Sequence, residues 1–154
     1  MARYALIIGI TEYQSPHLSR LPKAATDAEI VAQVLEQYGN FLVKRVPESW
    51  TPERTRKVGE KKVTGAELGQ ELETLLLKQA TGNEALIYFA GHGFTVSDNL
   101  GEQQGFLATS DCQIEMAGEV AIAQKYGISL ESLNRLIGKS ELSSLVMLLD
   151  CCHS

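Results

Sequence analysis

The sequence has few of the residues that mark secreted or membrane proteins. Its three cysteines, Cys112, Cys151 and Cys152, include an adjacent pair and form no disulfide framework, so reduced thiols in the cytosol fit better. The longest apolar run near the N-terminus, residues 5–8, is far shorter than the about 20 residues of a membrane-spanning helix, and no signal peptide is present. We therefore expect a soluble, cytoplasmic protein that does not contact membranes.

Positive charge is also scarce. The 14 lysines and arginines are outnumbered by 19 aspartates and glutamates, which gives a net charge of −5. Because a nucleic-acid-binding surface needs a clustered excess of positive charge, we expect no nucleic-acid partner. Apolar residues make up 44% and charged residues 21% of the 154 positions. These fractions are typical of globular proteins, exclude disordered and fibrous classes, and fit one domain.

Three short apolar runs, residues 4–10, 85–90 and 145–149, are typical of strands that a parallel sheet buries on both faces. Residues 40–46 alternate more, which favours an edge strand, and Pro47 ends it.

Helical patterns separate these strands. Residues 25–38 place apolar side chains at a spacing of three to four, at Ala28, Val31, Val34, Leu35 and Tyr38. Thr64 and Glu67 form a capping box ahead of four leucines, and Ser129 caps a third helix that ends before Gly138. The alternation predicts an α/β layered fold, with a mainly parallel sheet flanked by helices.

Two segments interrupt the alternation. Residues 51–62 are polar and basic, which predicts an exposed loop. Residues 94–123 contain two short apolar pieces around a polar, glycine-containing stretch, which predicts a hairpin beside the main sheet.

Reactive side chains follow two of the predicted strands. Residues 90–93 (Ala-Gly-His-Gly) follow the third strand, and residues 150–154 (Asp-Cys-Cys-His-Ser) follow the last. The carboxyl ends of parallel strands meet at one edge of a sheet, so we expect the two motifs to be neighbours. A cysteine thiolate can attack a carbonyl while a histidine moves the proton. The glycines would let the chain turn sharply, and the N–H groups of Gly93 and Cys152 could stabilise an oxyanion.

Simpler interpretations exist for the same residues. His92 could be a histidine in a turn, and the cysteine pair could be buried packing, because free cysteine packs like a small hydrophobic residue. A metal site from both cysteines, His92 and His153 is disfavoured, because adjacent side chains of an extended chain point apart and no Cys-x-x-Cys spacing exists. We therefore expect no metal, and we interpret Cys112 and His17 as structural or incidental.

The two motifs resemble those of a known family. Residues 88–93 (Tyr-Phe-Ala-Gly-His-Gly) resemble the histidine motif of caspase-like cysteine peptidases. Residues 148–154 (Leu-Leu-Asp-Cys-Cys-His-Ser) resemble the cysteine motif of the metacaspase and prokaryotic orthocaspase branch, so we expect a bacterial protein. Residues 5–10, Tyr13 and residues 21–28 also match that branch, whereas the animal-caspase signature Gln-Ala-Cys-x-Gly is absent.

The resemblance implies a role for each matched residue. His92 would be the general acid and base, Cys152 the nucleophile, and Cys151 a spectator. Asp27 and Asp150 would form a pocket for a substrate arginine or lysine, because two carboxylates favour a cation between them and repel an aspartate. Asp27 could instead interact with a helix dipole, and Asp150 could be a hydrogen-bond acceptor at a strand end. The reaction would need no cofactor. The calcium-binding residues of related enzymes lie beyond Ser154, which leaves calcium dependence open.

Family members continue past this serine with a glycine, a cleavable loop and further strands. We therefore expect residues 1–154 to be the large-subunit portion of a caspase-like catalytic domain. This portion would be inactive and prone to associate unless a complementary small-subunit segment pairs with the exposed last strand.

The leading functional hypothesis is a cysteine endopeptidase that cleaves polypeptides after arginine or lysine. One alternative is a truncated or degenerate caspase-like module that acts through protein–protein contacts. Another is a cysteine hydrolase of the same fold with a different substrate.

Overall fold

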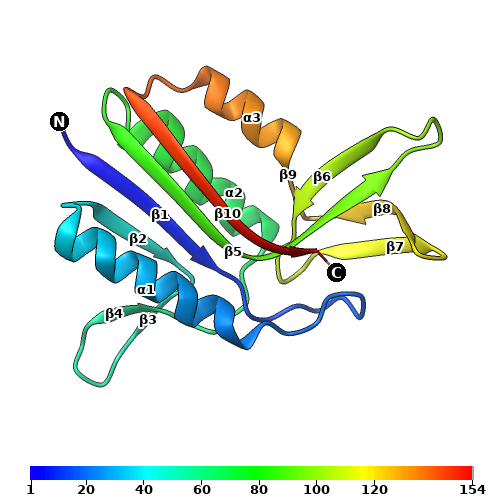
Figure 1. The fold of residues 1–154 in the computed structure, drawn as a ribbon, viewed down its shortest axis with the longest axis horizontal. Coiled ribbons are helices and arrows are strands. Elements are labelled where there is room, and N and C mark those ends of the chain that lie inside the picture. Colours follow the sequence, from blue (N-terminus) through cyan, green and yellow to red (C-terminus); the bar gives the residue numbers. More distant parts are fainter. Residues whose placement is uncertain (154) are drawn as a thin grey trace.

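A mostly parallel sheet forms the centre of the molecule, as the strand pattern predicts (Figure 1). The structure is a computed structural model that describes residues 1–153, with only the backbone described at Cys152 and His153. Four parallel strands lie side by side in the order β2 (Leu42–Val46), β1 (Arg3–Gly9), β5 (Glu84–Ser97) and β10 (Ser144–His153). The mixed α/β class is confirmed.

Strand β5 continues well beyond its parallel neighbour β1. Its last residues pair with the antiparallel strand β6 (Gln103–Leu107), which pairs in turn with β9 (Ile128–Ser129). The predicted hairpin is thus confirmed, but it extends the central sheet. A second hairpin, β7 (Gln113–Ala117) and β8 (Val120–Lys125), was not predicted. Its strands are only partly buried and contain polar residues, so they lack a continuous apolar run.

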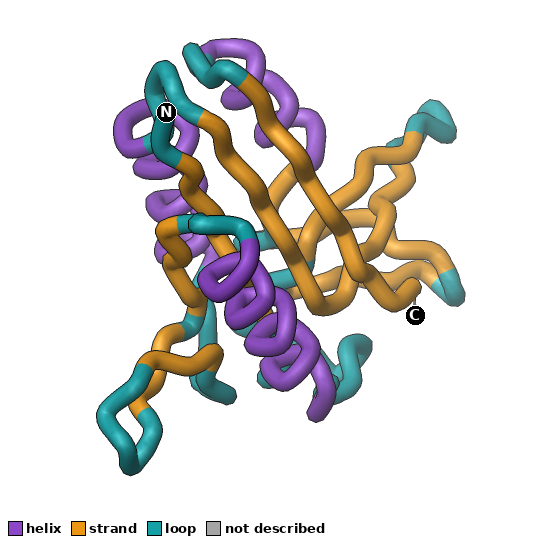
Figure 2. The backbone as a smooth tube through the Cα atoms, turned by 60° about the vertical axis from the view of Figure 1, so that its left-hand side comes forward, coloured by secondary structure: helices purple, strands orange, loops and turns teal. Residues whose placement is uncertain are grey.

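Helix α1 (Pro22–Tyr38) covers one face of the sheet (Figure 2). It packs through small side chains, and a β-carbon at Gly9 would lie 2.8 Å from the carbonyl oxygen of Ala24, so helix and strand approach closely. The prediction that Val34 and Tyr38 belong to the buried stripe is wrong, because they are 50% and 83% exposed. The buried stripe consists of Ala24, Ala25, Ala28 and Ala32.

The other face is covered by α2 (Gly65–Thr74), its π-helical continuation η1 (Leu75–Gln79) and α3 (Leu130–Lys139). The Thr64 half of the predicted capping box and the predicted cap at Ser129 are confirmed: Thr64 Oγ1 accepts from Glu67 N–H, and Ser129 Oγ accepts from Ser132 N–H. The predicted end of α3 is wrong, since Gly138 lies inside the helix. The four leucines of the predicted stripe are buried in the core, at Leu68, Leu72, Leu75 and Leu76.

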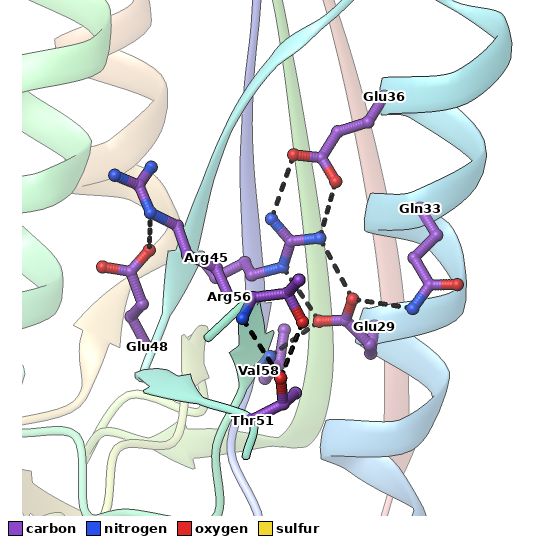
Figure 3. Close-up of polar contacts among 9 residues, drawn as sticks. Glu29, Gln33, Glu36, Arg45, Glu48, Thr51, Arg56 and Val58 are labelled. Carbon is purple, nitrogen blue, oxygen red and sulfur yellow. Dashed lines mark hydrogen bonds and ion pairs between the residues drawn. The ribbon is translucent and has the colours of Figure 1, made fainter. Parts of the chain in front are cut away.

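The basic segment 51–62 is more ordered than predicted. It contains β4 (Arg56–Val58), which pairs with β3 (Glu48–Trp50). Val58 is buried, and its N–H donates to Glu29 Oε1 at 2.7 Å. Glu29 also pairs at 2.9 Å with Arg45, which is only 3% exposed (Figure 3). A buried ion pair that also satisfies a backbone N–H therefore fixes the hairpin to α1 and β2.

Candidate active site

The register between β5 and β10 brings the two reactive motifs together. It runs in parallel from Ser144 opposite Glu84 to His153 opposite Gly93, and it sets Cys152 opposite His92. Neighbouring strands lie about 4.8 Å apart. Both motifs lie inside strands and not after strand ends, contrary to our expectation, because β5 continues unbroken through His92.

The side chains of Cys152 and His153, and the whole of Ser154, lie outside the described residues. The assignment of Cys152 as nucleophile, and the alternative of a metal site that uses these side chains, therefore stay predictions.

The imidazole of His92 is buried and held in one orientation. It is 2% exposed, and its Nε2 lies 2.8 Å from the carbonyl oxygen of Ser19. A carbonyl only accepts hydrogen bonds, so Nε2 carries a proton, and a neutral ring then has a free electron pair on Nδ1. That Nδ1 is buried and has no hydrogen-bond partner among the described side chains. His92 is thus arranged to accept a proton at Nδ1.

A closed loop before α1 provides the groups that hold His92. The backbone N–H of His92 donates to the hydroxyl of Tyr13 at 3.0 Å, and the two rings pack edge to face at 4.8 Å. The loop is closed by a hydrogen bond from Leu21 N–H to Thr11 O at 3.0 Å. Sequence reasoning found Tyr13 only as a family match and missed Ser19, because a backbone carbonyl has no signature in residue type.

The two glycines beside His92 permit close packing. The expectation that they let the chain turn sharply is wrong, because both lie in β5 and neither has a positive φ. A β-carbon at Gly91 would lie 2.7 Å from the Tyr13 hydroxyl, and one at Gly93 would lie 3.3 Å from Cys151 Cβ. Glycine at position 91 is therefore what lets Tyr13 reach the backbone of His92.

Both predicted acidic residues act on one tyrosine. Asp150 Oδ2 accepts a hydrogen bond from the Tyr88 hydroxyl at 3.1 Å, and Asp27 lies near the start of α1. Burial, the hydrogen bond to Asp150 and the negative charges of Asp150 and Asp27 raise the pKa of Tyr88 to about 12. The Asp150 carboxylate therefore contacts this hydroxyl and the Asp27 carboxylate acts on it through its charge, and both carboxylates are exposed. Sequence reasoning used Tyr88 only as part of a motif and missed this connection.

The imidazole and the acidic residues share one face of the sheet. Side chains alternate along a strand, so Tyr88, Ala90 and His92 point to the same side. Tyr88 and Ala90 pack against α1, and Asp150 lies opposite Ala90 in the register. Cys151 lies on the other face, partly buried against the core beneath α2 and α3. A substrate residue beside Asp150 would therefore lie near His92 and not near Cys151.

Two other residues singled out in the sequence lie apart from these groups. Cys112 is buried, and burial is the main cause that raises the pKa of its thiol to about 11. His17 is exposed and lines a cavity beyond Gly93.

Comparison with known proteins identifies the family. The model of the caspase domain family matches residues 2–154. The chain belongs to the caspase domain family. It is therefore a member of a family of cysteine peptidases, hydrolases that act on polypeptides. The comparison with curated proteins found no match.

Among solved structures, the crystal structure of protein GSU0716 from Geobacter sulfurreducens is similar in fold, with a TM-score of 0.68 and 18% sequence identity. The match covers 100% of this chain and 52% of that one, so the chain spans about half the length of this structural relative. Within residues 1–153, no helix has the length and apolar character needed to cross a membrane.

Proposed function

We propose that this chain carries the catalytic residues of a cysteine endopeptidase of the metacaspase and orthocaspase branch, which cleaves after arginine or lysine. The register that sets Cys152 opposite His92 is the observation that carries the proposal. It supports proton transfer between Cys152 and His92, because the two residues lie opposite each other on neighbouring strands.

The proposed reaction has two stages. His92 Nδ1 accepts the thiol proton of Cys152, and the thiolate attacks the substrate carbonyl carbon. The N–H groups of Gly93 and Cys152 stabilise the resulting oxyanion. The tetrahedral intermediate collapses, the C–N bond breaks, and His92 returns the proton to the leaving amine. Water then hydrolyses the thioester with His92 as base, which regenerates the thiol without any cofactor.

The preference for a basic residue follows from the carboxylates of Asp27 and Asp150. Both lie close enough to Tyr88 to raise its pKa, which supports a shared acidic pocket. An arginine or lysine side chain between the carboxylates gains two favourable charge interactions, whereas an aspartate would be repelled by both.

Reporter peptides with arginine, lysine or aspartate before a fluorogenic leaving group test this proposal on the purified native protein. We expect cleavage of the arginine and lysine reporters, loss of activity in Cys152→Ala and His92→Ala, and retained activity in the matched control Cys151→Ala. The variants Asp27→Asn and Asp150→Asn should lower kcat/KM for basic reporters by at least tenfold. Preferential cleavage after aspartate, or an active Cys152→Ala variant, would contradict the proposal.

We also propose that a complementary small-subunit segment pairs with β10. Two observations support it: β10 pairs only with β5 within the described part of the chain, and the side chains from Val146 to Leu149 are 36–50% exposed. An unpaired, apolar edge strand favours association. We expect residues 1–154 alone to be inactive and to self-associate in light scattering. A monomeric 154-residue chain that cleaves an arginine reporter would contradict this.

A further inference from the structure

The segment that contains the β3–β4 hairpin has an excess of positive charge, unlike the chain as a whole. Residues 51–62 contain five of the 14 lysines and arginines but only two of the 19 aspartates and glutamates, in a chain whose net charge is −5. We call β3, β4 and the turn between them, residues 48–58, the basic hairpin. It extends beyond α1 and away from the central sheet in both views of the fold (Figures 1 and 2).

Two cations of the basic hairpin have no carboxylate partner. Arg54 and Lys57 are exposed, and neither side chain forms an ion pair within residues 1–153. The nearby Arg56 is paired with Glu48 at a distance of 3.5 Å, and 56% of its side chain is exposed. Neighbouring cations repel one another, so a negatively charged partner would be attracted to this surface.

The backbone of Arg54 also indicates a function for its side chain. Its φ is +62°, in the left-handed region that favours glycine. The turn is closed by hydrogen bonds from Arg54 N–H to Thr51 O at 2.9 Å and from Thr51 N–H to Thr55 O at 2.8 Å. A charged residue therefore lies where glycine would relieve the backbone, and such strain is found where a side chain has a functional role.

Trp50 adds an aromatic surface beside these cations. It is the only tryptophan of the sequence, and it is 60% exposed. The guanidinium of Arg56, which lies opposite Trp50 in the register, is 5.5 Å from the centroid of its ring. Tryptophan and arginine are enriched among the residues that contribute most to binding, so this exposed pair is typical of a contact surface.

The basic hairpin is held firmly at its base. Val58 N–H donates to Glu29 Oε1 at 2.7 Å, Glu29 pairs with the buried Arg45, and Lys61 Nζ donates to Glu48 O at 3.0 Å. A surface that is already ordered loses little conformational freedom when a partner binds.

The backbone of the basic hairpin suits an extended partner. The hydrogen bond from Gly59 N–H to Pro47 O fixes the alternation of the antiparallel ladder. By this alternation, the N–H and C=O groups of Trp50 and Arg56 point away from the other strand of the hairpin. An extended peptide can form hydrogen bonds with backbone groups that point outward in this way.

We propose that the basic hairpin binds an extended, acidic segment of a partner polypeptide. The carboxylates of the segment would lie against Arg54 and Lys57, and its backbone would lie beside Trp50. A peptide is favoured over a nucleic acid, because the exposed Glu53 in the turn and the net charge of −5 would repel a continuous phosphate backbone. The inference does not depend on the proposed function, since none of the proposed catalytic residues belongs to the basic hairpin.

Fluorescence anisotropy with labelled peptides tests this inference on the purified native protein. The acidic probe alternates glutamate and valine over about eight residues, and the matched neutral probe alternates glutamine and valine. We expect the acidic probe to bind about tenfold more tightly than the neutral probe in about 50 mM salt, as two exposed ion pairs predict. This difference should shrink in about 200 mM salt, because salt screens exposed charges.

Two substitutions connect the binding to the basic hairpin. Arg54→Gly removes a charge and suits the φ of +62°, so the turn is retained, and Lys57→Gln removes the second charge. Each should weaken binding of the acidic probe about threefold, and the double variant about tenfold. Lys125→Gln is the matched control, because Lys125 is an exposed lysine of β8 without an ion pair in the described part of the chain. It should keep the wild-type affinity.

A reversal of charge distinguishes recognition from loss of folding. The double variant Arg54→Glu and Lys57→Glu should reject the acidic probe and bind a probe that alternates lysine and valine, which an unfolded hairpin would not do.

The outcomes are distinct from those that test the proposed function. Equal affinity for the acidic and neutral probes, or unchanged affinity in the double variant Arg54→Gly and Lys57→Gln, overturns the inference. Tighter binding of a labelled single-stranded oligonucleotide than of the acidic probe also overturns it, in favour of a nucleic-acid site. Cleavage of an arginine reporter is measured in parallel, and its absence contradicts the proposed function while the binding result stands.

Discussion

At the scale of single residues, the site depends on contacts between Tyr13, Gly91 and His92 that tolerate no added atoms. Tyr13 reaches the backbone of His92 only because position 91 has no β-carbon. The contacts of the imidazole fix which nitrogen carries the proton. Orientation is central to this chemistry, because a displacement of about 1 Å in a catalytic group can cost about 100-fold in rate.

The variant Gly91→Ala tests this packing. Its β-carbon would lie 2.7 Å from the Tyr13 hydroxyl and 2.8 Å from the Phe89 ring, so Tyr13 must move away from the His92 backbone. We expect kcat/KM for an arginine reporter to fall at least tenfold. Gly138→Ala is the control, because it lies within α3 with no atom within 4 Å of the new β-carbon. It should keep full activity and stabilise the fold by about 0.5–1 kcal/mol. Wild-type kcat/KM in Gly91→Ala would contradict the account.

A second prediction concerns the titration of Tyr88. Its pKa is raised to about 12 from the usual 10, so the folded state holds the phenolic proton more tightly than the unfolded state. The stability that this proton contributes is present below pH 10 and is lost as the pH rises toward 12. In an ultraviolet titration of the five tyrosines, we expect a component near pH 12 that Tyr88→Phe removes and Asp150→Asn shifts downward. A titration unchanged by Asp150→Asn would show that the carboxylate does not act on Tyr88.

At the scale of elements, the parts recognised from sequence are those with local signatures. The capping hydroxyls of Thr64 and Ser129 bond to N–H groups three residues away, and β1 is a continuous apolar run, so a single segment contains the information. Strand β4 has no such local pattern. It is ordered by the hydrogen bond from Val58 N–H to Glu29 Oε1, 29 residues away, which a single segment of sequence does not reveal. The contact of Ser19 with His92 spans 73 residues and uses a backbone atom. Sequence predicts which residues are reactive but not what orients them.

The Arg45 ion pairs lead to a prediction about α1. Burial would raise the pKa of Glu29, but hydrogen bonds from Arg45, Val58 N–H and Gln33 outweigh it and hold that pKa below its usual value. We expect Glu29→Gln to lower the free energy of unfolding by about 2 kcal/mol in urea denaturation at pH 7. The control Glu36→Gln should cost less than about 1 kcal/mol, because the Glu36 side chain is 42% exposed.

The pH dependence of the Glu29 variant follows from the lowered pKa. The contribution of the Glu29 carboxylate is present above the unfolded pKa of about 4.5 and is lost as the pH falls through the lower folded value. The difference between wild type and Glu29→Gln should therefore shrink as the pH falls below the unfolded pKa of 4.5 and through the lower folded value. Equal costs for Glu29→Gln and Glu36→Gln at pH 7 would contradict the role of the buried pair.

At the scale of the whole molecule, the parallel sheet is what unites the site. His92 and Cys152 lie on two strands that are far apart in sequence. The register between β5 and β10 sets the two residues opposite each other. The adjacent loop holds the imidazole, α1 brings Asp27 to the same face as Asp150, and the β7–β8 hairpin lies beyond Gly93. Membership of the caspase domain family agrees with this arrangement.

The most direct test of the central claim is to identify the residue that an arginine-based chloromethyl ketone alkylates, by mass spectrometry of the purified native protein. The account predicts modification of Cys152, greatly slowed in His92→Ala. Cys112 should be spared, because its pKa of about 11 leaves little thiolate at pH 8. Modification of Cys151 or Cys112 in place of Cys152, or labelling of Cys152 at an unchanged rate in His92→Ala, would contradict the account.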